Sequence, residues 1–361
     1  MKYVLFFLNV VVVHVSFCQT DTLYYDSASG NYIVRYLGTT EIGSNTGKDT
    51  LITLIYEPPT KIDPVVQGFV SPTADGKYLY RYRITNGTRA QQNLNEFSLH
   101  YDPSVWVESR TPETSWRNRA RTMRDYSHNV NAERVSTWVW RGDQGLEATW
   151  YIDSCMLLSN GLPSITDSYS QAKTRIWAWP AGGPNQKDTL ASDIRMKLLH
   201  LEVYPNANVL RKTIGPKLPP DPFVPSDYLD TLLSFTHQSA DLGWLGRGRD
   251  NDCDDDERPD DGIVKNIELR LQKANRELTR GDSVQARKKL EKLVQKVERI
   301  WKRSQEEEKK HGRDRWERQD NVIMTSEAYA LLKYNSEYLI DRLPDKSKHS
   351  REDDKDKKPK K

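Results

Sequence analysis

The chain has 361 residues, of which 29% are charged, and its formal net charge is only +3. This length is enough for two domains, since about 150 residues per domain is a fair prior. The small net charge excludes a global attraction to nucleic acid or to an anionic membrane, so we expect no nucleic-acid partner. Three cysteines are too few for the disulfide framework of a small secreted domain.

Residues 1–18 predict a secretory signal peptide. The basic Lys2 precedes an apolar run from Tyr3 to Val13, and small residues before Gln19 suit cleavage there. The run is too short for a transmembrane helix, which needs about 20 apolar residues. No later segment predicts a membrane span, so we expect a protein that is secreted, periplasmic or on the cell surface.

A lipoprotein signal is the alternative for the same segment. Acylation would keep Cys18 as the first mature residue, but the bulky Phe17 before it argues against this. After cleavage, residues 19–30 form an N-terminal segment ahead of the first domain. The mature chain then holds Cys155 and Cys253, and the sequence leaves open whether they are separate thiols or a disulfide.

Residues 31–212 show the alternation of β-strands. In "KYLYRYRITNG" one face carries Tyr78, Tyr80, Tyr82 and Ile84, and the other carries the basic side chains. About seven such runs, each ended by Gly, Pro, Asn or Asp, follow without helical periods between them. This pattern predicts an all-β antiparallel sandwich of the immunoglobulin-like type. The proline-rich residues 213–225 predict a semi-rigid linker, because prolines cannot donate to a central strand.

Residues 226–344 change to helical periodicity and predict a separate small all-α bundle. Ser226 is the expected cap of the first helix, and "RGDS" ends one helix and caps the next. The last helix is expected to begin near Thr325 or Ser326 and to end at Pro344. Each helix is apolar on one side only, so we expect the bundle to fold by itself. Residues 345–361 are almost without apolar side chains and predict a disordered tail.

The helical half resembles the FIMAH-type module at the C-terminus of uncharacterised exported bacterial proteins, which also carry a similar β-domain. The residues that carry this resemblance are Leu242–Trp244, Leu271, Ala274, Leu278, Gly281, Asp282, Ala286, Leu290 and the segment from Ser326 to Pro344. These are mostly core and cap residues. The resemblance therefore implies a fold and no catalytic residue.

Motifs that carry chemistry are sparse. The mature histidines are isolated in the sequence, and the chain has no HExxH, G-x-S-x-G, C-x-x-C or phosphate-binding glycine loop. A site assembled from distant residues would escape such a search, since a triad is defined by its geometry. A secreted hydrolase with an unrecognised site in the sandwich is therefore the alternative to a non-catalytic protein.

Aromatic and basic side chains suggest two ligand-binding surfaces. Trp138 with Trp140, and Trp177 with Trp179, are same-face pairs that either stack on sugars or pack the core. Around Trp116, a predicted loop carries several arginines, among them Arg117, Arg119 and Arg121. These either grip an anionic glycan or phosphate through bidentate bonds, or are simply solvated.

The acidic loop 250–261 holds eight carboxylates around Cys253. Calcium is the one cofactor that the sequence suggests, with ligands from Asp250, Asp252, Asp254 and Asp256. An EF-hand reading fails because Pro259 would occupy a ligand position. A solvated spacer before the next helix is the alternative that we favour. Dense negative charge raises the pKa of a thiol, which argues against Cys253 as a nucleophile.

Together these patterns predict a non-catalytic exported or cell-surface binding protein of unknown ligand. The sandwich would provide a face for an extracellular glycan or an envelope protein, and the helical module would serve interaction or assembly.

Overall fold

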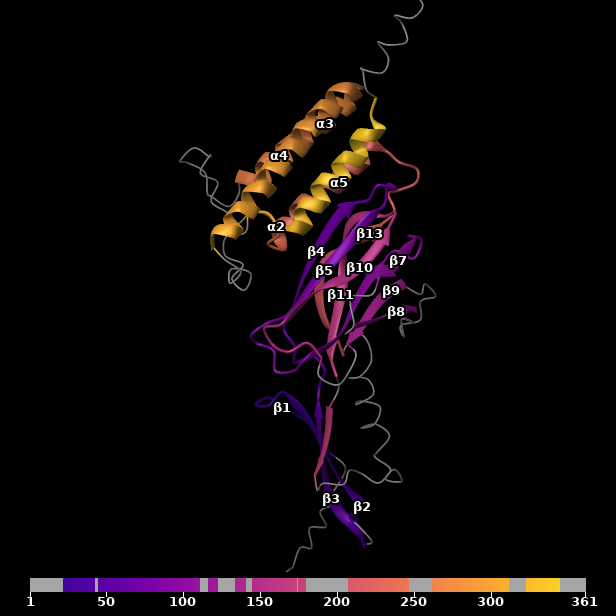
Figure 1. Cartoon of the computed structure of the whole chain (residues 1–361), viewed down its shortest axis with the longest axis vertical. Helices are drawn as coiled ribbons and strands as arrows, with labels where there is room; N and C mark the ends of the chain where they lie inside the picture. Colours follow the sequence, from indigo (N-terminus) through magenta and orange to yellow (C-terminus); the bar gives the residue numbers. More distant parts are fainter. Residues whose placement is uncertain are drawn as a thin grey trace, which may run out of the picture. The chain divides into compact units, whose positions relative to one another are not determined.

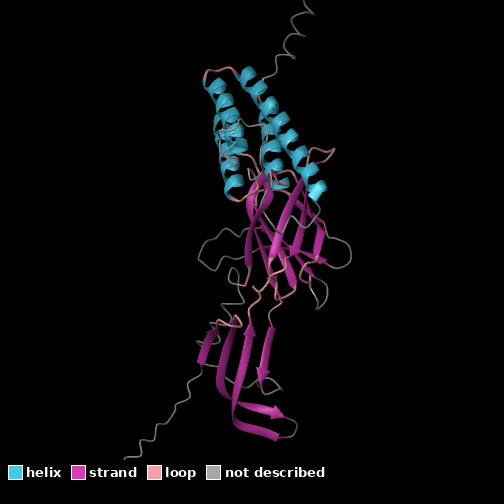
Figure 2. Ribbon diagram, turned by 90° about the vertical axis from the view of Figure 1, so that its left-hand side faces the viewer, coloured by secondary structure: helices cyan, strands magenta, loops and turns pink. Residues whose placement is uncertain are grey.

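The structure is a computed structural model that describes residues 22–42, 45–110, 116–122, 134–140, 145–173, 175–179, 207–246, 262–311 and 323–344. The predicted signal peptide, Cys18, Cys253, the acidic loop 250–261 and the tail 345–361 lie outside these residues. The predicted order, antiparallel β-structure followed by helices, is confirmed. Figure 2 shows the strands in magenta and the helices in cyan. None of the described helices is both long and apolar enough to cross a membrane.

By their internal contacts, the residues fall into two compact units, Met1–Pro59 with Thr174–Ala207, and Thr60–Lys173 with Asn208–Lys361. The described part of the first unit is one antiparallel sheet in the order β1-β2-β3-β12. Its strands are β1 (Thr22–Asp26), β2 (Asn31–Ile42), β3 (Asn45–Glu57) and β12 (Arg175–Trp179). Val34, Tyr36, Ile52 and Leu54 form a buried cluster in this sheet, and Tyr56 is buried as well. The expected sandwich 31–212 is thus divided, because β2, β3 and β12 pair only with one another and with β1 among the described strands.

The second unit contains a sandwich of two antiparallel sheets. One sheet has the order β4-β5-β10-β7, with β4 (Pro64–Pro72), β5 (Tyr78–Asn86), β10 (Tyr151–Ser159) and β7 (Val107–Arg110). The other has the order β13-β11-β6-β9-β8, with β13 (Val209–Lys217), β11 (Leu162–Ala172), β6 (Leu94–Tyr101), β9 (Arg134–Trp140) and β8 (Trp116–Thr122). Residues 213–217 of the expected linker therefore belong to a strand. Pro216 is tolerated there because β13 is an edge strand, where a missing donor breaks no ladder.

The predicted alternation of β5 is confirmed. Tyr80, Tyr82 and Ile84 are fully buried between the sheets, whereas Arg81 faces out and is exposed. The hydroxyl of Tyr82 donates to the carbonyl of Ile214 at 2.9 Å, so a polar atom inside the core is satisfied.

Four described helices follow the sandwich: α2 (Pro225–Asp241), α3 (Gly262–Thr279), α4 (Ser283–His311) and α5 (Ser326–Arg342). Pro225 occupies the first turn of α2, and Val224, not the predicted Ser226, is its N-cap residue. The turn between α3 and α4 is as predicted, since Gly281 has a φ of 79° and Asp282 accepts from the Gln285 N–H at 2.9 Å. Thr325 caps α5, also as predicted.

The apolar stripes of α3 and α4 face one shared core with α2 and α5. The buried side chains that the sequence indicated are Ile263, Ile267, Leu271 and Ala274 on α3, and Ala286, Leu290, Leu293, Val297 and Ile300 on α4. Leu162 of the sandwich belongs to the same cluster. In Figure 1 the helices lie together over one end of the sandwich.

Helix α5 joins this bundle to the sandwich. Its side chains Ala330, Leu331 and Tyr334 pack with Ile214 of β13, and Tyr334 donates to the carbonyl of Val70 at 3.1 Å. β4 and β13 are both edge strands, whose free backbone groups need partners. The helix therefore closes an open edge of the sandwich, and the helices are not a separate body.

Candidate functional site

The predicted tryptophan pair of β9, Trp138 and Trp140, packs in the core of the sandwich. Trp138 has no exposed surface and stacks on Phe97, with ring centroids 5.6 Å apart. Trp140 is partly buried and packs against the same cluster. This burial corrects the candidacy of Trp138 as a sugar platform, since a ligand cannot reach a ring that lies between two sheets.

The other predicted residues are not brought to one place. Trp177 and Trp179 lie on β12 of the four-stranded sheet, paired with Ile55 and Thr53 of β3. They are therefore outside the sandwich to which the sequence analysis assigned them. The predicted arginine loop is a strand: β8 pairs with β9 from Trp116 to Thr122, and the arginines alternate along it at Arg117, Arg119 and Arg121.

A different set of aromatic and basic residues comes together on the outward face of the sheet β4-β5-β10-β7. Phe69 of β4 is paired with Arg81 of β5, and the carbon atom Cζ of Arg81 lies 5.2 Å from the centroid of its ring. Arg83 follows two residues later on the same face of β5. Its Cζ lies 5.8 Å from the Phe69 ring and 5.2 Å from the ring of Tyr151 on β10. We call these four side chains the arginine–aromatic row.

The two guanidinium groups of the row differ in their partners. Arg83 forms an ion pair with Asp153, in which Nη2 lies 3.3 Å from Oδ2. Arg81 is exposed and forms no ion pair with another residue that the structure describes. A cation–π contact restricts the position of a guanidinium but does not consume its N–H groups, which can still donate hydrogen bonds. Arg81 is thus a positioned cation that has donors available for a ligand.

Exposed aromatic surface continues the row at one end. Tyr151 is 48% exposed, and its neighbour Trp150 is 59% exposed. Large exposed rings next to arginines are typical of binding surfaces, because they provide contact area at low cost in conformational entropy. The row crosses three neighbouring strands and so spans about 10 Å.

The backbone leading into Tyr151 is strained. Thr149 has a φ of 69°, which is an unusual conformation for a β-branched residue. Two backbone hydrogen bonds hold it, from the Thr149 N–H to the Asn86 carbonyl at 2.6 Å and from the Asn86 N–H to the Trp150 carbonyl at 3.0 Å. Strain of this kind persists only where surrounding contacts enforce it, and it is concentrated at functional sites.

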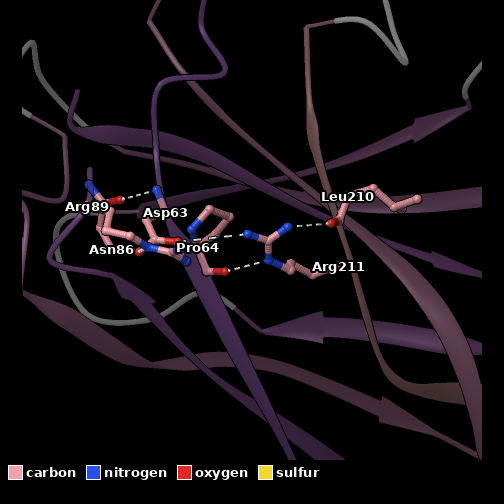
Figure 3. Close-up of polar contacts among 6 residues, drawn as sticks. All are labelled: Asp63, Pro64, Asn86, Arg89, Leu210 and Arg211. Carbon is pink, nitrogen blue, oxygen red and sulfur yellow. Dashed lines mark hydrogen bonds and ion pairs between the residues drawn. The ribbon is translucent and has the colours of Figure 1, made fainter. Parts of the chain in front are cut away.

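A polar cluster holds the strands at this end of the sheet (Figure 3). The Asp63 carboxylate accepts two hydrogen bonds from Arg89, at 3.1 and 3.0 Å, while Nη2 of Arg211 lies 3.9 Å from it. Arg211 also donates to the carbonyl of Pro64 at 3.0 Å, which connects β13 to the start of β4. The buried amide of Asn86 accepts from the Asp63 N–H at 3.1 Å. The cluster uses its charges internally, so we assign it a structural role.

The sequence contains one local signal for the row. The alternation in "KYLYRYRITNG" placed Arg81 and Arg83 on the outward face of their strand. Their partners Phe69 and Tyr151 come from other strands, and no local pattern identifies which strand will lie next to β5.

A possible catalytic set on β6 is enclosed. Glu96, Ser98 and His100 share one face of that strand, and each is less than a tenth exposed. The hydroxyl of Ser98 lies 2.9 Å from that of Thr137 and 3.4 Å from the Glu96 carboxylate, and the ring of His100 packs on Tyr169. A nucleophile needs a path to substrate, whereas Ser98 is 1% exposed. Because its nucleophile is buried, this set gives the hydrolase alternative little support, whereas the arginine–aromatic row is exposed to a ligand.

The structure bears on the predicted thiols only at Cys155, and it does not describe the predicted calcium ligands. Asp250, Asp252, Asp254 and Asp256 lie outside the described residues, and within those residues no group of three or more His, Cys, Asp or Glu side chains is placed to hold a metal ion. Cys155 is a free thiol in the sandwich core, where burial raises its pKa well above the usual value. Cys155 is therefore a core residue that contributes to packing and not a reactive thiol.

No protein-family model matches the chain, and no curated protein matches it. Among solved structures, the chain is similar to an uncharacterized protein from Nocardia farcinica whose crystal structure reveals an immunoglobulin-like fold. The two are 12% identical with a TM-score of 0.25, and the match covers 42% of this chain and 97% of the other. A likeness this weak carries no argument about function, so the fold described above rests on strand order and burial.

Proposed function

We propose that this chain is an exported, non-catalytic binding protein that recognises an acidic glycan through the arginine–aromatic row. The observation that carries the proposal is Arg81, an exposed guanidinium held on the ring of Phe69 without an ion pair among the described residues. An unpaired cation destabilises a protein only when it is buried away from water. Here it is solvated, so it is available to a ligand.

The chemistry of the row favours a carboxylated sugar. A guanidinium presents its N–H groups as a planar fork that matches a carboxylate through two parallel hydrogen bonds. The exposed ring of Tyr151, which lies beside Arg83 in the same row, offers apolar surface on which the apolar face of a sugar ring can pack. A uronic acid combines these two features in one residue, whereas a neutral sugar leaves Arg81 without a partner.

Two sequence features support the remaining parts of the proposal. The apolar run after Lys2 supports export, which would bring the chain into contact with envelope or extracellular glycans. The α3–α4 hairpin around Gly281, with Leu271, Ala274 and Leu290 in its core, supports a FIMAH-like module that serves interaction or assembly.

The test is a titration of the full mature chain with an oligogalacturonate, followed by calorimetry. We expect binding to this acidic oligosaccharide and none to a neutral galactan of the same length. Arg81→Ala should weaken binding by about tenfold or more, because it removes charge-assisted hydrogen bonds. Arg81→Lys should recover only part of the loss, since a point charge cannot form the planar fork.

The chain offers a matched control next to β5, the strand that carries Arg81. Lys77 lies 4.5 Å from the ring centroid of Trp106, and Trp106 is 44% exposed, so this pair is a second exposed cation–π contact. Lys77→Ala and Trp106→Ala should leave binding unchanged. Equal losses from both pairs, or equal affinity for acidic and neutral sugars, would exclude the row as the site. Release of new reducing ends during the titration would favour the hydrolase alternative.

A further inference from the structure

We infer that the groove between α3 and α4 is a second binding site, and that its ligand carries phosphate. The groove has a volume of about 220 Å³ and lies on the side of the hairpin that faces away from the shared helical core. Its described lining residues are Asn266, Leu269, Arg270, Lys273, Lys289 and Lys292. The inference does not depend on the acidic-glycan proposal, because the two surfaces share no residue.

The helical repeat places these cations together. Arg270 and Lys273 are one turn apart on α3, as are Lys289 and Lys292 on α4, and the short connection at Gly281 brings the two helices antiparallel. Like charges at this spacing destabilise a helix by a few tenths of a kcal/mol per pair. Packing of the fold does not require them there, since the apolar stripes already cover the core.

Two acidic side chains of α4 are occupied on the flank that faces α5. Glu291 pairs with Arg287, whose Nε lies 3.0 Å from Oε1, and Glu298 pairs with Lys333 of α5. Among the described residues that line the groove there is no carboxylate, and none of its four cations forms an ion pair with another described residue. Positive charge is therefore concentrated between α3 and α4 and compensated between α4 and α5.

The kind of cation decides between anions. Three of the four are lysines, whose ammonium groups are compact point charges with three donors each. Several converging point charges suit a tetrahedral, multiply charged phosphate better than a single planar carboxylate. Nε of Arg270 donates to Oδ1 of Asn266 at 2.8 Å, which orients the guanidinium and leaves its Nη atoms for a ligand. Leu269, 42% exposed, adds an apolar contact beside the charges.

The test uses inorganic pyrophosphate as the probe and the full mature chain. Calorimetry at low salt should show binding that weakens as salt is added, because the attraction is between solvent-exposed charges. The double substitution Lys289→Gln/Lys292→Gln should weaken binding by about tenfold or more, since it removes two charged donors. Its circular dichroism and melting temperature should stay unchanged, because neither side chain is buried in the core.

A matched variant separates the groove from net charge. Lys288→Gln/Lys302→Gln removes the same charge from two exposed positions of α4 that do not line the groove. We expect this variant to bind pyrophosphate almost as the unaltered chain does. Equal losses in the two variants, or no binding by the unaltered chain, would overturn the inference.

Two further arms identify the source of the phosphate. Flotation with vesicles of phosphatidylcholine and about one third phosphatidylglycerol tests a lipid headgroup, and long-chain inorganic polyphosphate tests a soluble polymer. Capture by the vesicles that is lost in Lys289→Gln/Lys292→Gln supports the site and assigns it to lipid. Binding of polyphosphate alone, with the same loss, supports the site and assigns it to a soluble ligand. Capture that the double substitution leaves intact argues against the groove.

Discussion

Glu327 and Gly68, which are 259 positions apart, are joined by a hydrogen bond of 2.6 Å from the Gly68 N–H to the carboxylate atom Oε1. Glu327 lies in the first turn of α5, and Gly68 lies in the edge strand β4, where an added Cβ would come within 2.5 Å of Cγ1 of Ile214. The absence of a side chain at Gly68 therefore permits β4 and β13 to approach closely. The helix then supplies the acceptor that an edge strand otherwise takes from water.

Removing this acceptor should destabilise the second unit. Glu327→Ala leaves the N–H of Gly68 buried without a partner, and we expect a loss of about 1–3 kcal/mol in the free energy of unfolding. Glu327→Gln keeps an acceptor and should cost less. Urea denaturation of the full chain measures both. Identical stability of the alanine variant and the unaltered chain would contradict the role that we give to this bond.

The same carboxyl group should make stability depend on pH. Burial raises the pKa of Glu327, although the hydrogen bond from Gly68 partly opposes that shift. The folded chain therefore holds a proton on Glu327 at pH values where the unfolded chain, with a pKa of about 4.3, has released it. Its contribution is fully present below the unfolded pKa and is lost as the pH rises through the folded pKa. The difference in unfolding free energy between the unaltered chain and Glu327→Gln, measured at several pH values, should fall across that window. A difference in unfolding free energy that does not change with pH would contradict this role of Glu327.

The helices should depend on the sandwich. In α5, Ala330, Leu331 and Tyr334 pack on β13, and Asn335 donates to the carbonyl of Pro163 at 2.9 Å. A fragment of residues 226–344 exposes this surface to water, so we expect it to melt at a lower temperature and less cooperatively than the full chain. This expectation replaces the independent folding that the helical pattern alone favours. Circular dichroism during heating tests this expectation. A cooperative transition of the fragment at the melting temperature of the full chain would instead support independent folding of the helices.

Tryptophans of the core and of the surface should respond differently to truncation. Trp138→Ala removes a fully buried ring from between the sheets and should cost about 3–5 kcal/mol in stability. Trp150→Ala removes a ring that is 59% exposed and should cost little, while it weakens binding of the acidic oligosaccharide. Denaturation and calorimetry on the same two variants separate the roles. A severe loss of stability from Trp150→Ala would place that ring in the core instead.

Calcium should have little effect on the chain. If the acidic loop 250–261 is only a spacer, millimolar calcium leaves the melting temperature of the full chain almost unchanged. A true cage would stabilise the folded state by about 2.7 kcal/mol at a hundredfold excess over Kd. We expect the first result, because Pro259 and the spacing of the acids disfavour a closed set of oxygen ligands. A shift specific for calcium that disappears when Asp252, Asp254 and Asp256 become Asn would show a cage.

The sequence by itself determined which face of each element is buried. Tyr80, Tyr82 and Ile84 alternate with basic residues along β5, and Leu290, Leu293 and Val297 recur at helical spacing on α4; all six are buried as their period indicated. The turn at Gly281 and the cap at Thr325 were also readable, because each depends on residues within one turn of helix. Local periodicity and local caps need no knowledge of the rest of the chain.

Only the tertiary structure decided which elements meet. Two strands with the same alternation, β3 and β5, belong to different sheets, and the pairing of each depends on strands far away in the sequence. The arginine–aromatic row needs Phe69 and Tyr151 on either side of β5, and the edge of β4 needs Glu327 from the last helix. Side-chain period specifies what a segment buries but not its partner. The partner is set by the packing and hydrogen-bonding of the whole unit, which no window of sequence contains.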